Sequence, residues 1–194
     1  MNLFRRQGNL KILVILFAAT LLLYFPILKN PSILLNRGND LQEYYWPVAY
    51  FTKTHILTDH KLPFWNNMFF SGTPFLSDPQ SMLFYPPNII FIILPTNFAF
   101  IFWFIFHSLL GGIGAYIAAR KGFDFSRIAS VFTALFYITF PRTLGFAEAG
   151  HITLSASIAW LPFILLARIW LARKPNFYWL VLWAFCLTML FFLF

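Results

Sequence analysis

The sequence predicts an all-α integral membrane protein, and three observations lead to this fold class. Of its 194 residues 60% are hydrophobic and only 10% carry a charge, far below the quarter or so that is typical of soluble domains. Several uncharged runs approach the roughly 20 apolar residues that a helix needs to cross the hydrocarbon layer. The basic residues gather in short segments between these runs, as they do in multispanning proteins.

Five apolar runs are predicted to span the membrane. The first, about 10–28, follows the basic start MNLFRRQGNLK and has no small-residue cleavage site after it, which indicates an uncleaved signal anchor. The others are about 97–119, 127–146, 152–171 and 177–194. The last run is uncharged to its end, so we expect the chain to be the N-terminal part of a longer protein.

Residues 29–96 form a long loop between the first two spans. Its many prolines and glycines favour short helices and turns over a spanning helix. A membrane-surface helix is predicted at 41–57, because one face of it carries Leu41, Tyr44, Tyr45, Val48, Thr52 and Ile56. Asp40 and Glu43 match a capping arrangement, in which Asp40 accepts the backbone N–H of residue 43 and Glu43 reaches back.

The charges predict the orientation of the chain. The positive-inside rule places the N-terminus in the cytoplasm and both 29–96 and 141–151 outside. Nine of the fourteen basic residues then lie on the cytoplasmic side: Arg5, Arg6, Lys11, Arg120, Lys121, Arg127, Arg168, Arg173 and Lys174. The net charge of +8 is therefore a feature of one membrane face and argues against nucleic-acid binding. Cys186 is the only cysteine, so there is no disulfide framework.

Three blocks carry a resemblance to a known family. NDLQEYYWPVAYF, LPFWNNMFFSGTPFLSDPQSMLFYPPNII and EAGHITLSASIAWLP follow one another within 36–165. In this order they resemble the YfhO-type family of bacterial multispanning membrane proteins, which is similar in layout to the GT-C class of glycosyltransferases. The resemblance implies a GT-C-like N-terminal transmembrane core, in which the first outer loop carries surface helices and an essential acid. Asp40 is the residue that fits this position.

The function that the resemblance implies is transfer of a sugar from a polyprenyl-phosphate carrier to an acceptor on the outer face of a bacterial inner membrane. Asp40 would take the acceptor's proton or hold a metal. There is no DxD or paired DE motif at Asp40, which disfavours direct metal binding and leaves the need for a divalent metal open. Membrane lipids and the lipid-linked sugar are the implied partners. The alternative is a non-catalytic membrane protein that binds, moves or scaffolds lipid-linked glycans.

Further residues are candidates for binding the substrate. Glu148 and His151 are three apart beside the second outer segment, so on a helical turn they would share a face near Asp40. Arg37 and Arg142 are cations that suit a carrier phosphate, although anionic lipid headgroups explain them equally well. Asp78 precedes Pro79, which is also typical of a simple turn. The residues next to Asp40 complete the set: Gln42, Glu43 and Tyr44.

Two motifs inside the second span are interpreted as structural. GGIGA at 111–115 lacks the lysine and serine of a phosphate loop. Gly111, Ala115 and Ala119 instead form a small-residue stripe, which predicts close approach of another helix. His107 is predicted to make a packing hydrogen bond between helices.

Overall fold

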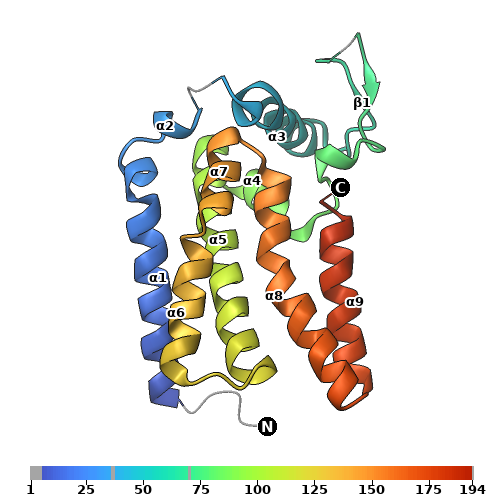
Figure 1. Ribbon diagram of the computed structural model, residues 1–194. Helices are drawn as coiled ribbons and strands as arrows, with labels where there is room; N and C mark the ends of the chain where they lie inside the picture. The colour runs from blue at the N-terminus through green and yellow to red at the C-terminus, as the bar shows by residue number, and fades with distance from the viewer. Residues whose placement is uncertain (1–5, 36–37, 70, 194) are drawn as a thin grey trace.

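The computed structural model describes residues 6–35, 38–69 and 71–193, with side chains from residue 10 onwards. Long helices run side by side as a bundle, and a separate helix lies across one end of it (Figure 1). The helices of the bundle and its connections are α1 (Arg6–Lys29), α2 (Ser32–Leu35), α4 (Ile89–Ile93), α5 (Thr96–Ile117), α6 (Arg127–Ile138), α7 (Pro141–Ala149), α8 (Ile152–Arg173) and α9 (Phe177–Phe191). The nearly all-α fold that the sequence predicts is confirmed.

Four helical segments in the described chain are long and apolar enough to cross a membrane: Leu10–Lys29, Thr96–Gly122, Arg127–Ala149 and Ile152–Arg173. They coincide with the first four predicted spans, and their number and character are compatible with a multi-pass membrane protein. The fifth predicted span, 177–194, contains the apolar helix α9, which has 15 residues and is shorter than the other four.

The third of these segments consists of two helices. α6 begins at Ser126, whose side chain accepts the backbone N–H of Ala129 at 3.2 Å, as the sequence predicts for a cap. The chain then leaves the helical conformation at Phe140, because the ring of the following Pro141 disfavours helical geometry in the residue before it. α7 resumes at Pro141, a residue that suits the first turn of a helix.

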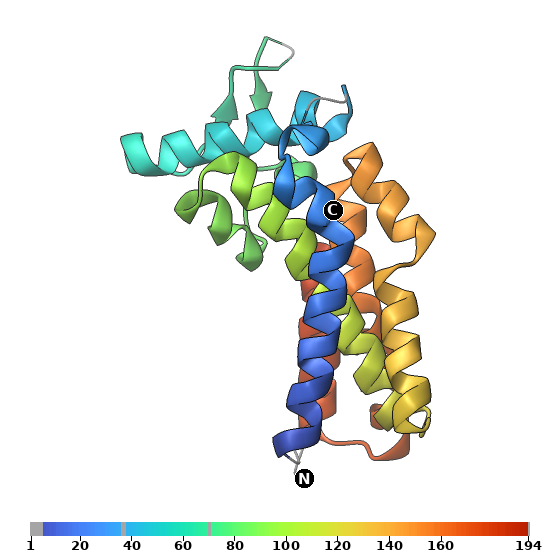
Figure 2. The ribbon, with the colours of Figure 1, turned by 90° about the vertical axis from the view of Figure 1, so that its left-hand side faces the viewer.

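A surface helix of residues 41–59 lies roughly perpendicular to the bundle (Figure 2). It consists of a wide π-helical turn η1 (Leu41–Tyr45), the α-helix α3 (Trp46–Thr54) and a second wide turn η2 (His55–Asp59). Of the face predicted from the sequence, Leu41, Tyr45 and Val48 are buried. The amphipathic pattern therefore predicted the helix, and three of the six residues on its predicted face are buried.

The rest of the long loop consists of short helices and turns, as the prolines and glycines predict, and of one small hairpin, which was not predicted. Strands β1 (Trp65–Asn66) and β2 (Thr73–Pro74) pair antiparallel and extend from the end of the molecule that carries the surface helix. Two short 3-10 turns follow, η3 (Pro79–Ser81) and η4 (Pro86–Asn88), and they lead into α4.

The core is built around α5, which packs against α1, α6 and α8. A Cβ atom on Gly111 would lie 3.2 Å from the backbone Cα of Ala159 in α8. Ala115 and Ala119 are also buried, so the small-residue stripe does serve helix packing as predicted.

A buried polar chain joins the loop to the core at His107. His107 Nδ1 lies 2.8 Å from the carbonyl of Trp103 and must donate to it, so Nε2 accepts from the Tyr85 hydroxyl at 2.8 Å. The Tyr85 oxygen in turn accepts from Trp160 Nε1 at 2.7 Å. The prediction that His107 makes packing hydrogen bonds is confirmed, and these bonds hold Tyr85, the residue before η4, onto α5 and α8.

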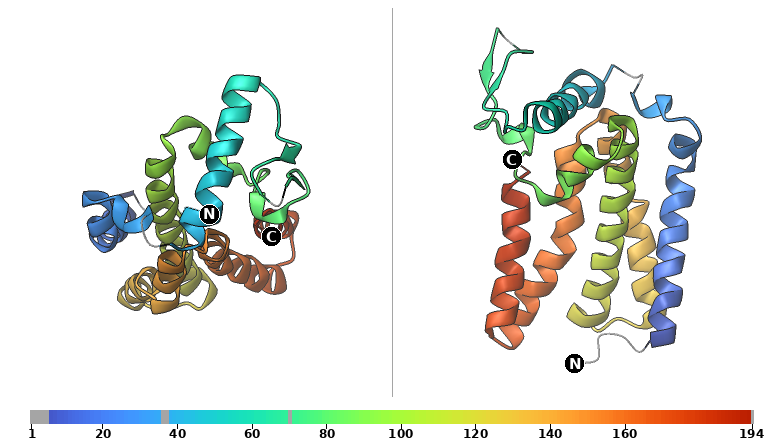
Figure 3. Two further views of the ribbon diagram at one scale, coloured as in Figure 1. Left: turned by 90° about the horizontal axis from the view of Figure 1, so that it is seen from above. Right: turned by 180° about the vertical axis from the view of Figure 1, so that it is seen from behind.

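The two ends of the bundle differ in charge. The turns between α5 and α6 and between α8 and α9 lie at the same end as the start of α1, while the surface helix, the hairpin and the α7–α8 turn lie at the opposite end (Figure 3). The first of these turns contains Lys121 and the second contains Lys174. Asp40, at the start of the surface helix, and Asp78, which accepts a hydrogen bond from Tyr44 on that helix, therefore lie at the same end.

Candidate functional site

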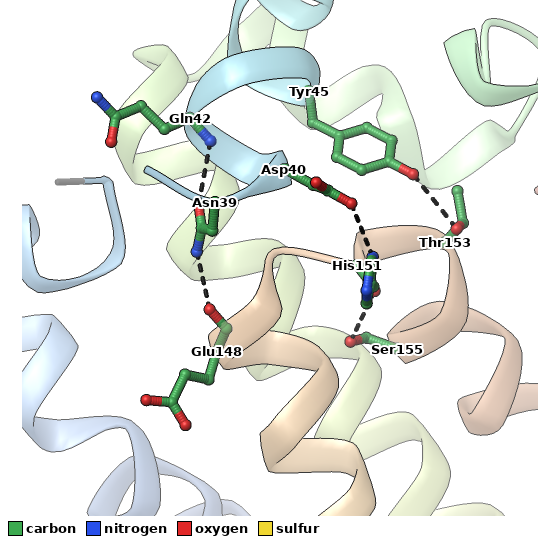
Figure 4. Close-up of polar contacts among 8 residues, drawn as sticks. All are labelled: Asn39, Asp40, Gln42, Tyr45, Glu148, His151, Thr153 and Ser155. Carbon is green, nitrogen blue, oxygen red and sulfur yellow. Dashed lines mark hydrogen bonds and ion pairs between the residues drawn. The ribbon is translucent and has the colours of Figure 1, made fainter. Parts of the chain in front are cut away.

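The candidate site lies where the start of the surface helix meets the turn between α7 and α8 (Figure 4). Asn39 bridges the two elements. Its Oδ1 accepts the backbone N–H of Gln42 at 3.2 Å, and its Nδ2 donates to the carbonyl of Glu148 at 2.8 Å. One side chain thus caps the surface helix and ties it to the end of α7.

Asp40 faces His151 across this junction. Asp40 Oδ2 lies 3.0 Å from His151 Nδ1, and the two side chains are 58% and 40% exposed. His151 donates to Asp40 through Nδ1–H, so its other ring nitrogen, Nε2, takes no part in this contact. The predicted capping role of Asp40 is wrong, because its side chain makes no cap hydrogen bond in the described structure and Asn39 supplies the cap instead.

Gly150 lets the two elements approach this closely. It adopts a left-handed conformation, with φ of +83°, at the end of α7. A Cβ atom at this position would lie 2.3 Å from the backbone nitrogen of Leu41. No residue but glycine fits here without displacing the surface helix, so Gly150 fixes the separation of Asp40 and His151.

Two tyrosines follow Asp40 on the surface helix. The Tyr44 hydroxyl donates a short hydrogen bond to Asp78, whose other oxygen accepts the backbone N–H of Gln80 at 2.9 Å. Burial, and then the contact with Asp78, raises the pKa of Tyr44, so its phenol stays protonated and acts as a donor. Burial also raises the pKa of Tyr45, whose hydroxyl lies 3.5 Å from Thr153 Oγ1.

The remaining predicted residues lie around the pair. Gln42 Oε1 accepts the backbone N–H of Gly38 at 3.0 Å and so shapes the loop before the surface helix. Glu43 is exposed on that helix. The guanidinium of Arg142 lies 5.4 Å from the centre of the Phe146 ring on α7. Arg37 falls outside the described residues.

Glu148 and His151 do not share a helical face, because α7 ends at Ala149 and Gly150 turns the chain. Figure 4 shows the Glu148 carboxylate directed away from the Asp40 and His151 pair. It is the backbone carbonyl of Glu148 that takes part in the junction. Within the described residues, no three His, Cys, Asp or Glu side chains come together as a metal site.

Sequence reasoning missed Asn39 and Gly150. Asn39 had a local signal, because asparagine is as good an N-cap as aspartate. Gly150 follows an apolar helix and precedes another, the position of a C-cap glycine, but its contact with Leu41 depends on the tertiary fold.

Comparisons of the chain with models of protein families, with curated proteins and with solved structures found no match.

Proposed function

We propose that this chain forms part of a membrane glycosyltransferase of GT-C type, which transfers a sugar from a polyprenyl-phosphate carrier to an acceptor outside the membrane. The observation that supports it is the pairing of Asp40 with His151. Asp40 does not cap its own helix, it contacts a histidine from a distant segment, and it remains 58% exposed, so a substrate has access to it. Such a carboxylate suits general-base catalysis.

In the proposed reaction Asp40 accepts the proton of the acceptor hydroxyl. The acceptor oxygen forms a bond to the anomeric carbon of the sugar, and the bond between that carbon and the carrier phosphate breaks. The electron pair of the broken bond leaves with the polyprenyl phosphate. His151 orients Asp40 through its Nδ1 and stabilises the negative charge of the carboxylate before it takes the proton. Arg142 on α7 carries the positive charge that suits the leaving phosphate.

The test is sugar transfer from a lipid carrier by the full-length protein carrying Asp40→Asn. Removal of a general base lowers a rate by about 10²- to 10⁴-fold, and we expect a loss in this range. Asp59→Asn is the matched control, because Asp59 also faces a histidine, with 3.7 Å between its Oδ2 and His55 Nε2, at the far end of the same helix. Transfer by Asp40→Asn at the parental rate would remove the assignment.

A non-catalytic role in binding lipid-linked glycans is the second candidate. It is favoured by the neighbours of the pair, because the Asn39 bridge and the close approach of Gly150 to Leu41 give this junction a structural role that requires no catalysis. In that case the parent protein binds the carrier but transfers no sugar, and Asp40→Asn lowers only its thermal stability.

A further inference from the structure

The wide turn η1 sets the direction in which Asp40 points. Trp46 donates its backbone N–H to the carbonyl of Leu41, which is five residues back rather than the four of an α-helix. If the turn relaxed to α-helical geometry, the residues before it would rotate about the helix axis by roughly 100°, the angle of one residue. Asp40 lies directly before the turn, so it would leave its position 3.0 Å from His151.

The backbone alone holds this turn weakly. Wide turns of the π-helical kind are rare, and they are frequent at functional sites. Pro47 follows Trp46 and has no N–H, so it donates no hydrogen bond back to the turn. The geometry of the turn therefore depends on contacts of its side chains.

The two tyrosines of the turn make these contacts. Tyr45 is buried, and its hydroxyl lies 3.5 Å from Thr153 Oγ1. The Tyr44 hydroxyl donates to Asp78 Oδ2 at 2.5 Å, and the Tyr44 ring stacks on Phe69 with 5.5 Å between the ring centres. A hydrogen bond to a carboxylate contributes more than one between neutral groups, so the bond from Tyr44 to Asp78 is the stronger of the two.

Asp78 is itself fixed, because its loop packs on α3. Its Oδ1 accepts the backbone N–H of Gln80 at 2.9 Å, and its own N–H donates to the carbonyl of Phe75 at 3.2 Å. Phe75 is buried against Val48 and Phe51 of α3, with 5.2 Å between the rings of Phe75 and Phe51. Asp78 thus connects the wide turn to a loop that is held by the next part of the same helix.

We propose that Tyr44 and Asp78 are positioning residues, whose hydrogen bond keeps the wide turn in its π-helical form and thereby holds Asp40 against His151. This inference rests on the proposed function, in which Asp40 is the general base. Tyr44 and Asp78 act through Asp40 and take no part in the proton transfer.

Hydrogen exchange of the full-length protein in detergent tests the hold on the turn. Tyr44→Phe removes the donor, and we expect the amides of 42–50 to exchange about ten- to hundredfold faster, the factor that one hydrogen bond to a charged group supplies. Tyr50→Phe is the matched control, because it removes a hydroxyl from a half-exposed tyrosine of the same helix. Exchange in α5 should stay unchanged in both variants, which shows that the bundle is folded.

Sugar transfer by the same variants tests the action through Asp40. We expect Tyr44→Phe to lower kcat about ten- to hundredfold with little change in KM. In a protein that already carries Asp40→Asn, Tyr44→Phe should cause no further loss, because no base remains to be positioned. A loss of stability alone would lower kcat by the same factor in both proteins.

Two substitutions of Asp78 separate its hydrogen bond from its charge. Asp78→Asn keeps a carbonyl oxygen that accepts from Tyr44, so we expect kcat within about threefold of the parent. Asp78→Leu has no acceptor, and its kcat should fall as far as that of Tyr44→Phe. An equally large loss in Asp78→Asn would overturn the role of the hydrogen bond.

Two further results would contradict the proposal. Exchange of 42–50 in Tyr44→Phe equal to that in Tyr50→Phe would show that the bond does not hold the turn. An equal loss of kcat with and without the Asp40 carboxylate would show that Tyr44 does not act through Asp40. If Asp40→Asn transfers sugar at the parental rate, the proposed function fails, whereas faster exchange in Tyr44→Phe would still support the hold on the turn.

Discussion

At the scale of single residues, two adjacent N-cap residues show what local sequence cannot decide. Asn39 and Asp40 are equally suited to cap the surface helix, and the spacing to Glu43 favours Asp40. The structure uses Asn39, because Asp40 has a tertiary partner in His151 at 3.0 Å. That partner comes from another segment, so no window of sequence around Asp40 contains the information.

The glycine of the α7–α8 turn gives a prediction at the same scale. Gly150→Ala places a Cβ atom 2.3 Å from the backbone of Leu41 and strains a residue with φ of +83°. We expect a loss of about 1–3 kcal/mol in the free energy of unfolding, measured by denaturation in detergent.

Gly145→Ala is the matched control within α7. A Cβ atom there has nothing within 4 Å, and alanine favours the helix by up to about 1 kcal/mol. The Gly150 contact would be unimportant if both variants had the stability of the parent.

At the scale of elements, the sequence predicts most helices because each has a local cause. Long apolar runs predict α1, α5 and α8, Ser126 predicts the start of α6, and the amphipathic face predicts the surface helix. The wide turns at both ends of the surface helix, η1 and η2, could not be predicted. They have no distinct composition, and the first of them carries the buried Leu41 and Tyr45.

Helix packing around α5 gives the second prediction. Gly111 lies against the backbone of Ala159 and the ring of Tyr137, and a Cβ atom on residue 111 would lie 3.2 and 3.1 Å from them. Gly111→Leu inserts a side chain for which there is no space, so we expect α5 and α8 to separate and the stability to fall by about 3 kcal/mol or more.

The loss is measured as a shift in the denaturation midpoint in detergent. Ala184→Leu, on the exposed side of α9, is the control and is expected to change the midpoint little. A midpoint for Gly111→Leu equal to that of the control would contradict the packing argument.

At the scale of the whole molecule, the arrangement of charges leads to a prediction about orientation. The surface helix lies at one end of the bundle and the turn at Lys121 at the other. With Cys186 replaced by alanine, Thr58→Cys should react with a membrane-impermeant maleimide on intact cells. Lys121→Cys should react only after the cells are made permeable. The opposite pattern would place Asp40 in the cytoplasm and exclude the proposed reaction.

The junction of Asn39, Asp40 and Leu41 with the α7–α8 turn has a consequence for biosynthesis. The first half of the junction leaves the ribosome long before residues 148–151 exist, so the surface helix has no anchor there while α5 and α6 are synthesised. Asp40 and His151 meet only once the turn before α8 is in place. A nascent chain that stops short of this turn carries the aspartate without its histidine, so the pair can perform no chemistry until that stage.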